Sequence, residues 1–139
     1  MNAVEFTPPP LKGFRMKPIR FVLLAALTAC PVIGLSAQLL VLNKSDATLA
    51  FMDPVSGKTA ATVATGDGPH EIEVSADGRL AFVSNYGAKD PGNSLSVVDI
   101  AARKEVKRVD LGEMGRPHGL TIANGRVYLT SEASKRVAS

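Results

Sequence analysis

An internal repeat constrains this 139-residue chain more than any other feature of its sequence. The Gly-Pro-His at residues 68–70 returns as Arg-Pro-His at 116–118, 48 residues later. Two more segments recur at spacings of 47 and 46 residues, namely 77–84 with 124–131 and 48–53 with 94–99. A unit of 46–48 residues holds four short strands, and a drift of one residue indicates loops of different length. The pattern therefore predicts a series of similar structural units.

Turn-forming dipeptides divide each unit into short strands. Asp77-Gly78 and Asn124-Gly125 are each predicted to close a hairpin, because both pairs accept positive φ. In the central unit we expect four strands, near 70–75, 80–85, 95–100 and 105–111. The fourth alternates apolar and charged residues, as an outer, half-solvated strand does. These features predict an all-β chain built from propeller blades.

The second strand of the central unit resembles a known family. Its Phe-Val-Ser-Asn at 82–85 looks like the Tyr-Val-Thr-Asn signature of the secreted bacterial YVTN β-propeller repeats, with looser copies at 128–131 and 40–43. The Gly-Pro before the first strand, the Ser-x-Asp-Gly-Arg hairpin and the Ser-Val-Val-Asp-Ile at 96–100 are similar to the same frame. The resemblance covers about 39–131, and the family that it indicates consists of propellers of the seven-bladed type.

The resemblance implies blades near 38–65, 68–112 and 116–139. That is a partial β-propeller of about two and a quarter four-stranded blades, whereas closed rings have about 4–8. We therefore expect the chain to be a truncated fragment of a longer protein. Open blade edges are also expected to allow self-association, because an unpaired edge strand can pair with another chain.

The net positive charge of the chain comes entirely from the first 37 residues. The chain has 16 Lys and Arg against 13 Asp and Glu, for a net charge of +3. Four basic residues and one acidic residue precede Gln38, so residues 38–139 are neutral overall. A nucleic-acid-binding domain needs its basic residues on the folded part, so no nucleic-acid partner is expected.

Residues 1–37 have the composition of a secretory leader. A 17-residue uncharged run at 21–37 follows a short basic patch and ends in Ser36-Ala37. We interpret 1–37 as a signal peptide region, with Met16 as a candidate true start, and 38–139 as the mature chain. This predicts a periplasmic or extracellular protein that contacts the membrane only transiently.

Two cleavage positions compete in this leader. Cleavage after Ala37 releases a soluble chain and is favoured here. The alternative is the Leu-Thr-Ala-Cys at 27–30, which resembles a lipoprotein box in which Cys30 would carry a lipid anchor. A polar tether normally follows such a cysteine, and here the apolar residues 31–35 follow it.

Both histidines of the protein occupy the same position in the repeat, at the start of a first strand. The first strand of a blade is its innermost, and an antiparallel hairpin brings the end of the second strand to the same rim, at the channel mouth. The ligand-binding candidates at this rim are His70, Glu71, Asn85, Arg116, His118 and Glu132. Imidazole and carboxylate groups suit a metal ion or a polar ligand, but a metal needs three or four converging donors. The favoured alternative is that Pro-His only shapes the loop before each first strand.

The sequence favours a binding or interaction scaffold over an enzyme. No motif assigns a catalytic residue, a cofactor or a particular metal, and the ligand could be a small molecule or a protein. The alternative is the remnant of a propeller lactonase or hydrolase, because some members of such families resemble this repeat pattern. That alternative would place a metal or polar-ligand site at the channel mouth.

Overall fold

A computed structural model describes residues 37–139, which form ten β-strands and no helix. Within these residues there is accordingly no helix that could cross a membrane. Residues 1–36 of the signal peptide region lie outside the described residues, and with them the candidate start at Met16 and the lipidation candidate Cys30.

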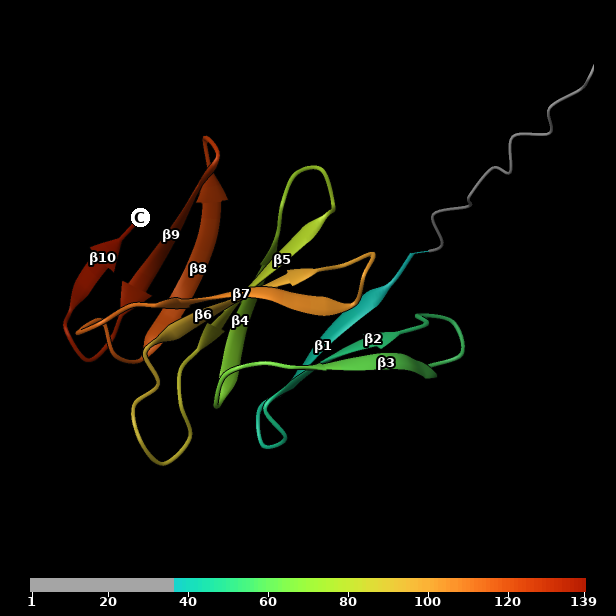
Figure 1. Cartoon of the computed structure of the whole chain (residues 1–139), viewed down its shortest axis with the longest axis horizontal. Helices are drawn as coiled ribbons and strands as arrows, with labels where there is room; N and C mark the ends of the chain where they lie inside the picture. Colours follow the sequence, from blue (N-terminus) through green and yellow to red (C-terminus); the bar gives the residue numbers. More distant parts are fainter. Residues whose placement is uncertain (1–36) are drawn as a thin grey trace, which may run out of the picture. The chain divides into compact units, whose positions relative to one another are not determined.

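The strands form three separate antiparallel sheets, which we call blades 1, 2 and 3 (Figure 1). Blade 1 consists of β1 (Leu39–Asn43), β2 (Thr48–Met52) and β3 (Thr59–Ala64). Blade 2 consists of β4 (Pro69–Val74), β5 (Leu80–Asn85), β6 (Ser94–Asp99) and β7 (Lys104–Asp110). Blade 3 consists of β8 (Pro117–Ala123), β9 (Arg126–Ser131) and β10 (Arg136–Ala138).

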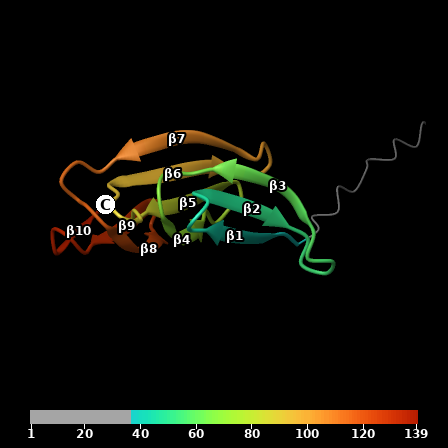
Figure 2. The same cartoon turned by 90° about the horizontal axis from the view of Figure 1, so that it is seen from below.

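The four-stranded blade 2 stands between the two three-stranded blades, as both views show (Figures 1 and 2). Its first strand β4 contacts β1 of blade 1 and β8 of blade 3, and β7 contacts β3. Similar sheets that follow one another in the chain and stack face to face form a partial β-propeller. The all-β fold class predicted from the repeat is therefore confirmed.

The strands lie within a residue or so of their expected positions, with one addition. No strand was predicted after residue 131, and the structure adds the three-residue β10 there. It pairs with β9, with Val137 opposite Thr130. Three residues hold too little alternation of apolar and polar side chains to be recognised as a strand from the sequence.

The buried apolar cluster of the structure lies between blades 1 and 2. Apolar side chains of the two facing sheets form one cluster in which every member is at most 8% exposed: Leu49, Phe51, Val63, Ala81, Val83 and Val98. Burying a Val, Leu or Phe side chain contributes about 1.5–3 kcal/mol. We call this cluster the blade 1–2 interface.

The two predicted hairpins close differently. Asn124 (φ 51°) and Gly125 (φ 73°) form a two-residue turn between β8 and β9, in which both residues have the predicted positive φ. The loop between β4 and β5 is longer, and there only Gly78 has positive φ. The loop between β8 and β9 is shorter than the loop between β4 and β5. Equivalent residues are therefore 48 apart in the first strands (Pro69 and Pro117) but 46 apart in the second strands (Asn85 and Ser131).

Candidate functional site

The first strands of blades 2 and 3 begin with the same irregularity. Pro69 pairs with Asn85, but the regular register of β4 resumes only at Ile72. In blade 3, Pro117 pairs with Ser131 and the register resumes at Leu120. A β-bulge changes the direction in which side chains point and is frequent beside functional sites. In both blades the bulge contains the histidine.

His70, Glu71 and His118 form a group that we call the histidine cluster. The rings of His70 and His118 lie 4.4 Å apart between centroids and are tilted by 45°. Nδ1 of His70 lies 3.6 Å from Oε1 of Glu71. One potential ligand atom from each of the three residues lies within 4.8 Å of the other two. Neighbouring residues of a regular strand point to opposite faces, so the bulge is what lets His70 and Glu71 converge.

A row of side chains crosses the three blades beside this cluster. Blade 1 begins with the counterpart of a second strand, because the Leu-Val-Leu-Asn at 40–43 in β1 matches 82–85 in β5 and 128–131 in β9. One residue directly follows each of these three strands: Lys44, Tyr86 and Glu132. Lys44 Nζ lies 4.8 Å from the centroid of the Tyr86 ring. The Tyr86 hydroxyl donates a 2.6 Å hydrogen bond to Oε2 of Glu132. We call these three residues the rim row.

The rim row and the histidine cluster contact each other. The Tyr86 ring lies 5.1 Å from the His70 ring and 5.8 Å, edge-on, from the His118 ring. The guanidinium of Arg116 lies 4.9 Å from the Tyr86 ring centroid. Tyr86 is therefore the ring around which the charged and imidazole side chains of all three blades gather.

Equivalent backbone hydrogen bonds fix this rim in blades 2 and 3. Tyr86 N–H donates to the carbonyl of Gly68 (3.1 Å), and Glu132 N–H donates to the carbonyl of Arg116 (3.0 Å). Both acceptors have left-handed backbone, with φ 56° at Gly68 and 52° at Arg116. A side chain at position 68 would collide with the backbone of Gly87, whereas in blade 3 this position is occupied by Arg116. The same turn thus carries a guanidinium in blade 3 and none in blade 2.

The candidate Asn85 lies beneath the rim and does not join the histidine cluster. It is 1% exposed, and its Nδ2 donates to the hydroxyls of Ser94 (3.0 Å) and Ser96 (2.9 Å). Asn43 in blade 1 donates similarly to Thr48 Oγ1 (3.1 Å). In both blades the asparagine at the end of the strand is therefore hydrogen-bonded to the next strand, from β5 to β6 and from β1 to β2.

The structure groups the other five predicted residues into two sets. His70, Glu71 and His118 converge on one another, and Arg116 and Glu132 both contact Tyr86. Tyr86 and Lys44 were not among the candidates. The signal that could have found them is their shared repeat position with Glu132, one residue after the second strand.

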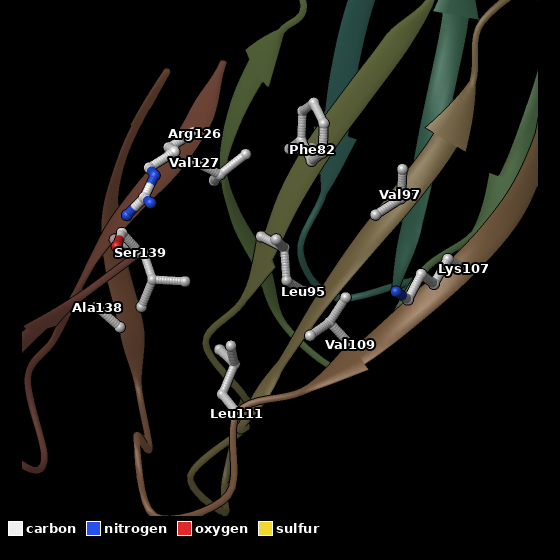
Figure 3. Close-up of a pocket in the computed structure, with 11 residues that line it drawn as sticks. Phe82, Leu95, Val97, Lys107, Val109, Leu111, Arg126, Val127, Ala138 and Ser139 are labelled. Carbon is white, nitrogen blue, oxygen red and sulfur yellow. The ribbon is translucent and has the colours of Figure 1, made fainter. Parts of the chain in front are cut away.

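A cleft of about 660 Å³ lies between blades 2 and 3 (Figure 3). One wall is formed by side chains of blade 2, including Phe82, Leu95 and Val97. The opposite wall comes from β9 and the end of the chain, including Arg126 and Val127. This lining is largely apolar, and no group in it matches the chemistry of the histidine cluster.

The fold is similar to parts of two much longer solved proteins. The chain is 30% identical to a hydrazine synthase of Kuenenia stuttgartiensis over 66% of its length, with a TM-score of 0.57. It is 16% identical to the dihydro-heme d1 dehydrogenase NirN, solved in complex with DHE, over 73% of its length, with a TM-score of 0.61. The chain spans 25% and 21% of these proteins, respectively. Both are β-propeller proteins, which supports the propeller fold.

Neither a family profile nor a curated protein matches the sequence. Membership of the YVTN family therefore stays a prediction from the residues at 82–85 and their frame.

Proposed function

We propose that this chain belongs to an exported β-propeller protein of the YVTN type that acts as a binding scaffold. Its ligand site would be the rim formed by the histidine cluster and the rim row. The observation that carries the proposal is the convergence of His70, Glu71 and His118 beside Tyr86, because these polar side chains come from two blades. Ligand sites commonly combine an aromatic surface with a few convergent polar groups.

The charges of the rim favour an oxyanion as part of the ligand. Lys44 and Arg116 both approach the Tyr86 ring, and Arg116 can bind a carboxylate or phosphate through two parallel hydrogen bonds. Glu71 and Glu132 balance these two cations. A ligand that also brings hydrogen-bond donors for the two carboxylates would fit this arrangement.

The proposal can be tested by titrating the full, metal-free chain with inorganic phosphate and with malonate while recording backbone amide NMR spectra. We expect the largest shifts at Lys44, Tyr86 and Arg116, and weaker binding in an Arg116→Gln variant. Lys107→Gln is the matched control, because Lys107 is a cation on the outer strand β7. A ligand site at the rim would be contradicted if the amides around Lys107 shifted as much as those of the rim. It would also be contradicted if Lys107→Gln weakened binding as much as Arg116→Gln.

A second candidate is an enzyme of the lactonase or hydrolase kind. It is favoured by the two imidazoles and one carboxylate of the histidine cluster, which are suitable general bases or metal ligands. The partial similarity to a hydrazine synthase also indicates that such blades occur within an enzyme. Hydrolysis of a simple lactone that disappears in His118→Gln but persists in Lys107→Gln would support this candidate over a pure scaffold.

Export is the part of the proposal that concerns residues 1–37. Expression of the full chain in a Gram-negative host should yield a periplasmic protein whose first residue is Gln38. A mature chain that begins with a lipid-modified Cys30 would show that the protein is a lipid-anchored form and not the soluble form proposed here. Retention of residues 1–15 in the precursor would contradict a start at Met16.

A further inference from the structure

We propose that His70, Glu71 and His118 bind a divalent transition metal of the Zn²⁺ type. This inference rests on the proposed function, since it names a component of the same rim site. The three residues contribute two imidazole nitrogens and one carboxylate oxygen from two blades. Three protein donors leave one coordination position open, as in zinc sites that take an exogenous ligand.

The distances leave room for an ion among the donors. Bonds of about 2.1 Å at tetrahedral angles place donor atoms about 3.4 Å apart. Nδ1 of His70 and Oε1 of Glu71 are 3.6 Å apart, which is already close to this value and too long for a good hydrogen bond. The His118 donor lies within 4.8 Å of both. His118 is exposed, so rotation of its side chain can complete the approach.

A second observation points to the same atom of His70. Nδ1 of this histidine is buried and has no hydrogen-bond partner within the described residues. A buried polar atom without a partner destabilises the folded state, because it has lost its bonds to water without replacement. A metal ion bound between this nitrogen and Glu71 would satisfy it, whereas a purely structural role for the Pro-His pair leaves it unexplained.

The donor set selects the class of metal. Imidazole nitrogen suits Zn²⁺, Cu²⁺ and Ni²⁺, whereas Mg²⁺ and Ca²⁺ prefer shells made of oxygen. The described residues contribute no thiolate, because the single cysteine of the protein is Cys30. Borderline transition metals are therefore the expected ligands, and Mg²⁺ is a suitable negative control.

A bound ion would also connect this cluster to the anion site proposed for the rim. Lys44 and Arg116 are balanced by Glu71 and Glu132, so the ion would add two positive charges to an otherwise neutral rim. An oxyanion could then occupy the open position of the metal while it contacts Arg116. We expect phosphate or malonate to bind more tightly to the zinc-loaded chain than to the metal-free chain.

The direct test is calorimetric titration of the full metal-free chain with Zn²⁺ in a Cys30→Ser background, which removes the competing thiol. We expect one site, with affinity reduced about 100-fold or more in His70→Gln and in His118→Gln, because each leaves only two donors. Glu71→Gln should lose about tenfold, since the neutral amide is a weaker ligand. Glu73→Gln is the matched control, because it removes a carboxylate from the same strand outside the cluster.

Cobalt provides a readout that a structural role of the histidines would not change. Co²⁺ bound by two imidazoles and a carboxylate in four-coordinate geometry absorbs visible light strongly, whereas octahedral Co²⁺ in water absorbs weakly. We expect the strong absorption in the parent chain and in Glu73→Gln, and its loss in both histidine variants. Equal Zn²⁺ affinity in the parent and histidine variants, or equal affinity for Mg²⁺ and Zn²⁺, would overturn the proposal.

The two proposals can fail separately. If phosphate binds the metal-free chain at the rim and Zn²⁺ does not bind, the metal site is wrong and the binding scaffold stands. If Zn²⁺ binds and neither oxyanion shifts any rim amide, the metal site stands and the proposed ligand site is wrong.

Blade 3 offers a variant that should strengthen the site. Gly119 occupies the position that corresponds to Glu71, and its N–H bonds to Thr130 Oγ1 (2.9 Å) as that of Glu71 bonds to Ser84 Oγ (3.1 Å). The double change Gly119→Glu with Thr130→Ser copies the blade 2 arrangement and brings a second carboxylate to the cluster. We expect about tenfold tighter Zn²⁺ binding, and an unchanged or weaker affinity would count against the assigned geometry.

Discussion

The two contacts between neighbouring blades are built from different interactions. Blades 1 and 2 meet through the apolar blade 1–2 interface, where Leu49 and Phe51 are fully buried, and one cation–π contact from Lys44 joins them at the rim. Blades 2 and 3 are separated on their apolar side by the cleft of about 660 Å³. Strands β4 and β5 of blade 2 also contact β8 of blade 3. At the polar rim these two blades share the histidine pair and the bond from Tyr86 to Glu132.

This difference teaches that a repeated sequence does not produce a repeated interface. The alternation of the strands places apolar residues on the facing sheets in both cases, but the side chains fill the space only between blades 1 and 2. The side chains of the histidine cluster lie at the other contact, which also contains the cleft. Sites that bind ligands are commonly drawn from such less tightly packed regions.

The largest expected effect compares two leucines at the same repeat position. Leu49→Ala removes a fully buried side chain from the blade 1–2 interface and should lower the free energy of unfolding by about 4–5 kcal/mol. Leu95→Ala removes a side chain that borders the cleft and should cost about 2–3 kcal/mol, because water and neighbouring groups can enter the space. Urea denaturation of both variants measures the difference. Equal costs would show that the two contacts are packed equally well.

An intermediate effect is expected at the polar contact. Ser84 Oγ accepts a hydrogen bond from Glu71 N–H (3.1 Å) and donates one to the carbonyl of His118 in blade 3 (3.4 Å). Ser84→Ala should cost about 1–2 kcal/mol, since it leaves partly buried groups in both blades without a partner. Thr130→Val, at the equivalent exposed position, should cost about 0.5 kcal/mol or less, because water replaces the hydroxyl. A larger loss for Thr130→Val in the same denaturation experiment would refute the bridging role of Ser84.

The smallest effect concerns the hairpins at the opposite end of blades 2 and 3. Hydrogen bonds from the Ser75 hydroxyl and from Arg79 N–H lower the pKa of Asp77 below its ordinary value of 3.8. A carboxylate with a lowered pKa stabilises the folded hairpin above pH 3.8, and this contribution is lost as the pH falls through the lowered value. The amide of Arg79 should therefore titrate with a midpoint below 3.8 in NMR spectra.

Blade 3 provides the control for this titration. Its hairpin has Asn124 where blade 2 has Asp77, so the amide of Arg126 should show no such step. Asp77→Asn should abolish the step at Arg79. A midpoint at or above the ordinary aspartate value would contradict the hydrogen bonds at Asp77.

Much of the fold could be predicted because the signals are local and repeated. Turn residues such as Gly78 and Gly125 and the alternation within β7 depend only on residues close in the chain, so the strands fell near their expected positions. The strand β10 was missed because its partner β9, and not its own pattern, makes it a strand.

The site could be predicted only where repeat position determines spatial position. His70 and His118 were placed together on that argument, and the structure brings them to 4.4 Å. Asn85 is buried against the third strand and lies outside the histidine cluster. The sequence cannot predict this, because it does not show whether the last residue of a strand faces the rim or the third strand. Tyr86 and Lys44 were missed because their contacts with residues of other blades depend on side-chain direction.

At Arg116 the left-handed backbone lowers the stability of the fold, while the side chain supplies a cation to the rim. Glycine adopts this conformation freely, as Gly68 does in blade 2, whereas a residue with a Cβ atom loses about 1–2 kcal/mol. The guanidinium beside Tyr86 is therefore attached at a position where its own backbone resists it. A sequence drifting toward greater stability would replace this arginine with glycine and would lose a cation of the rim in the same step.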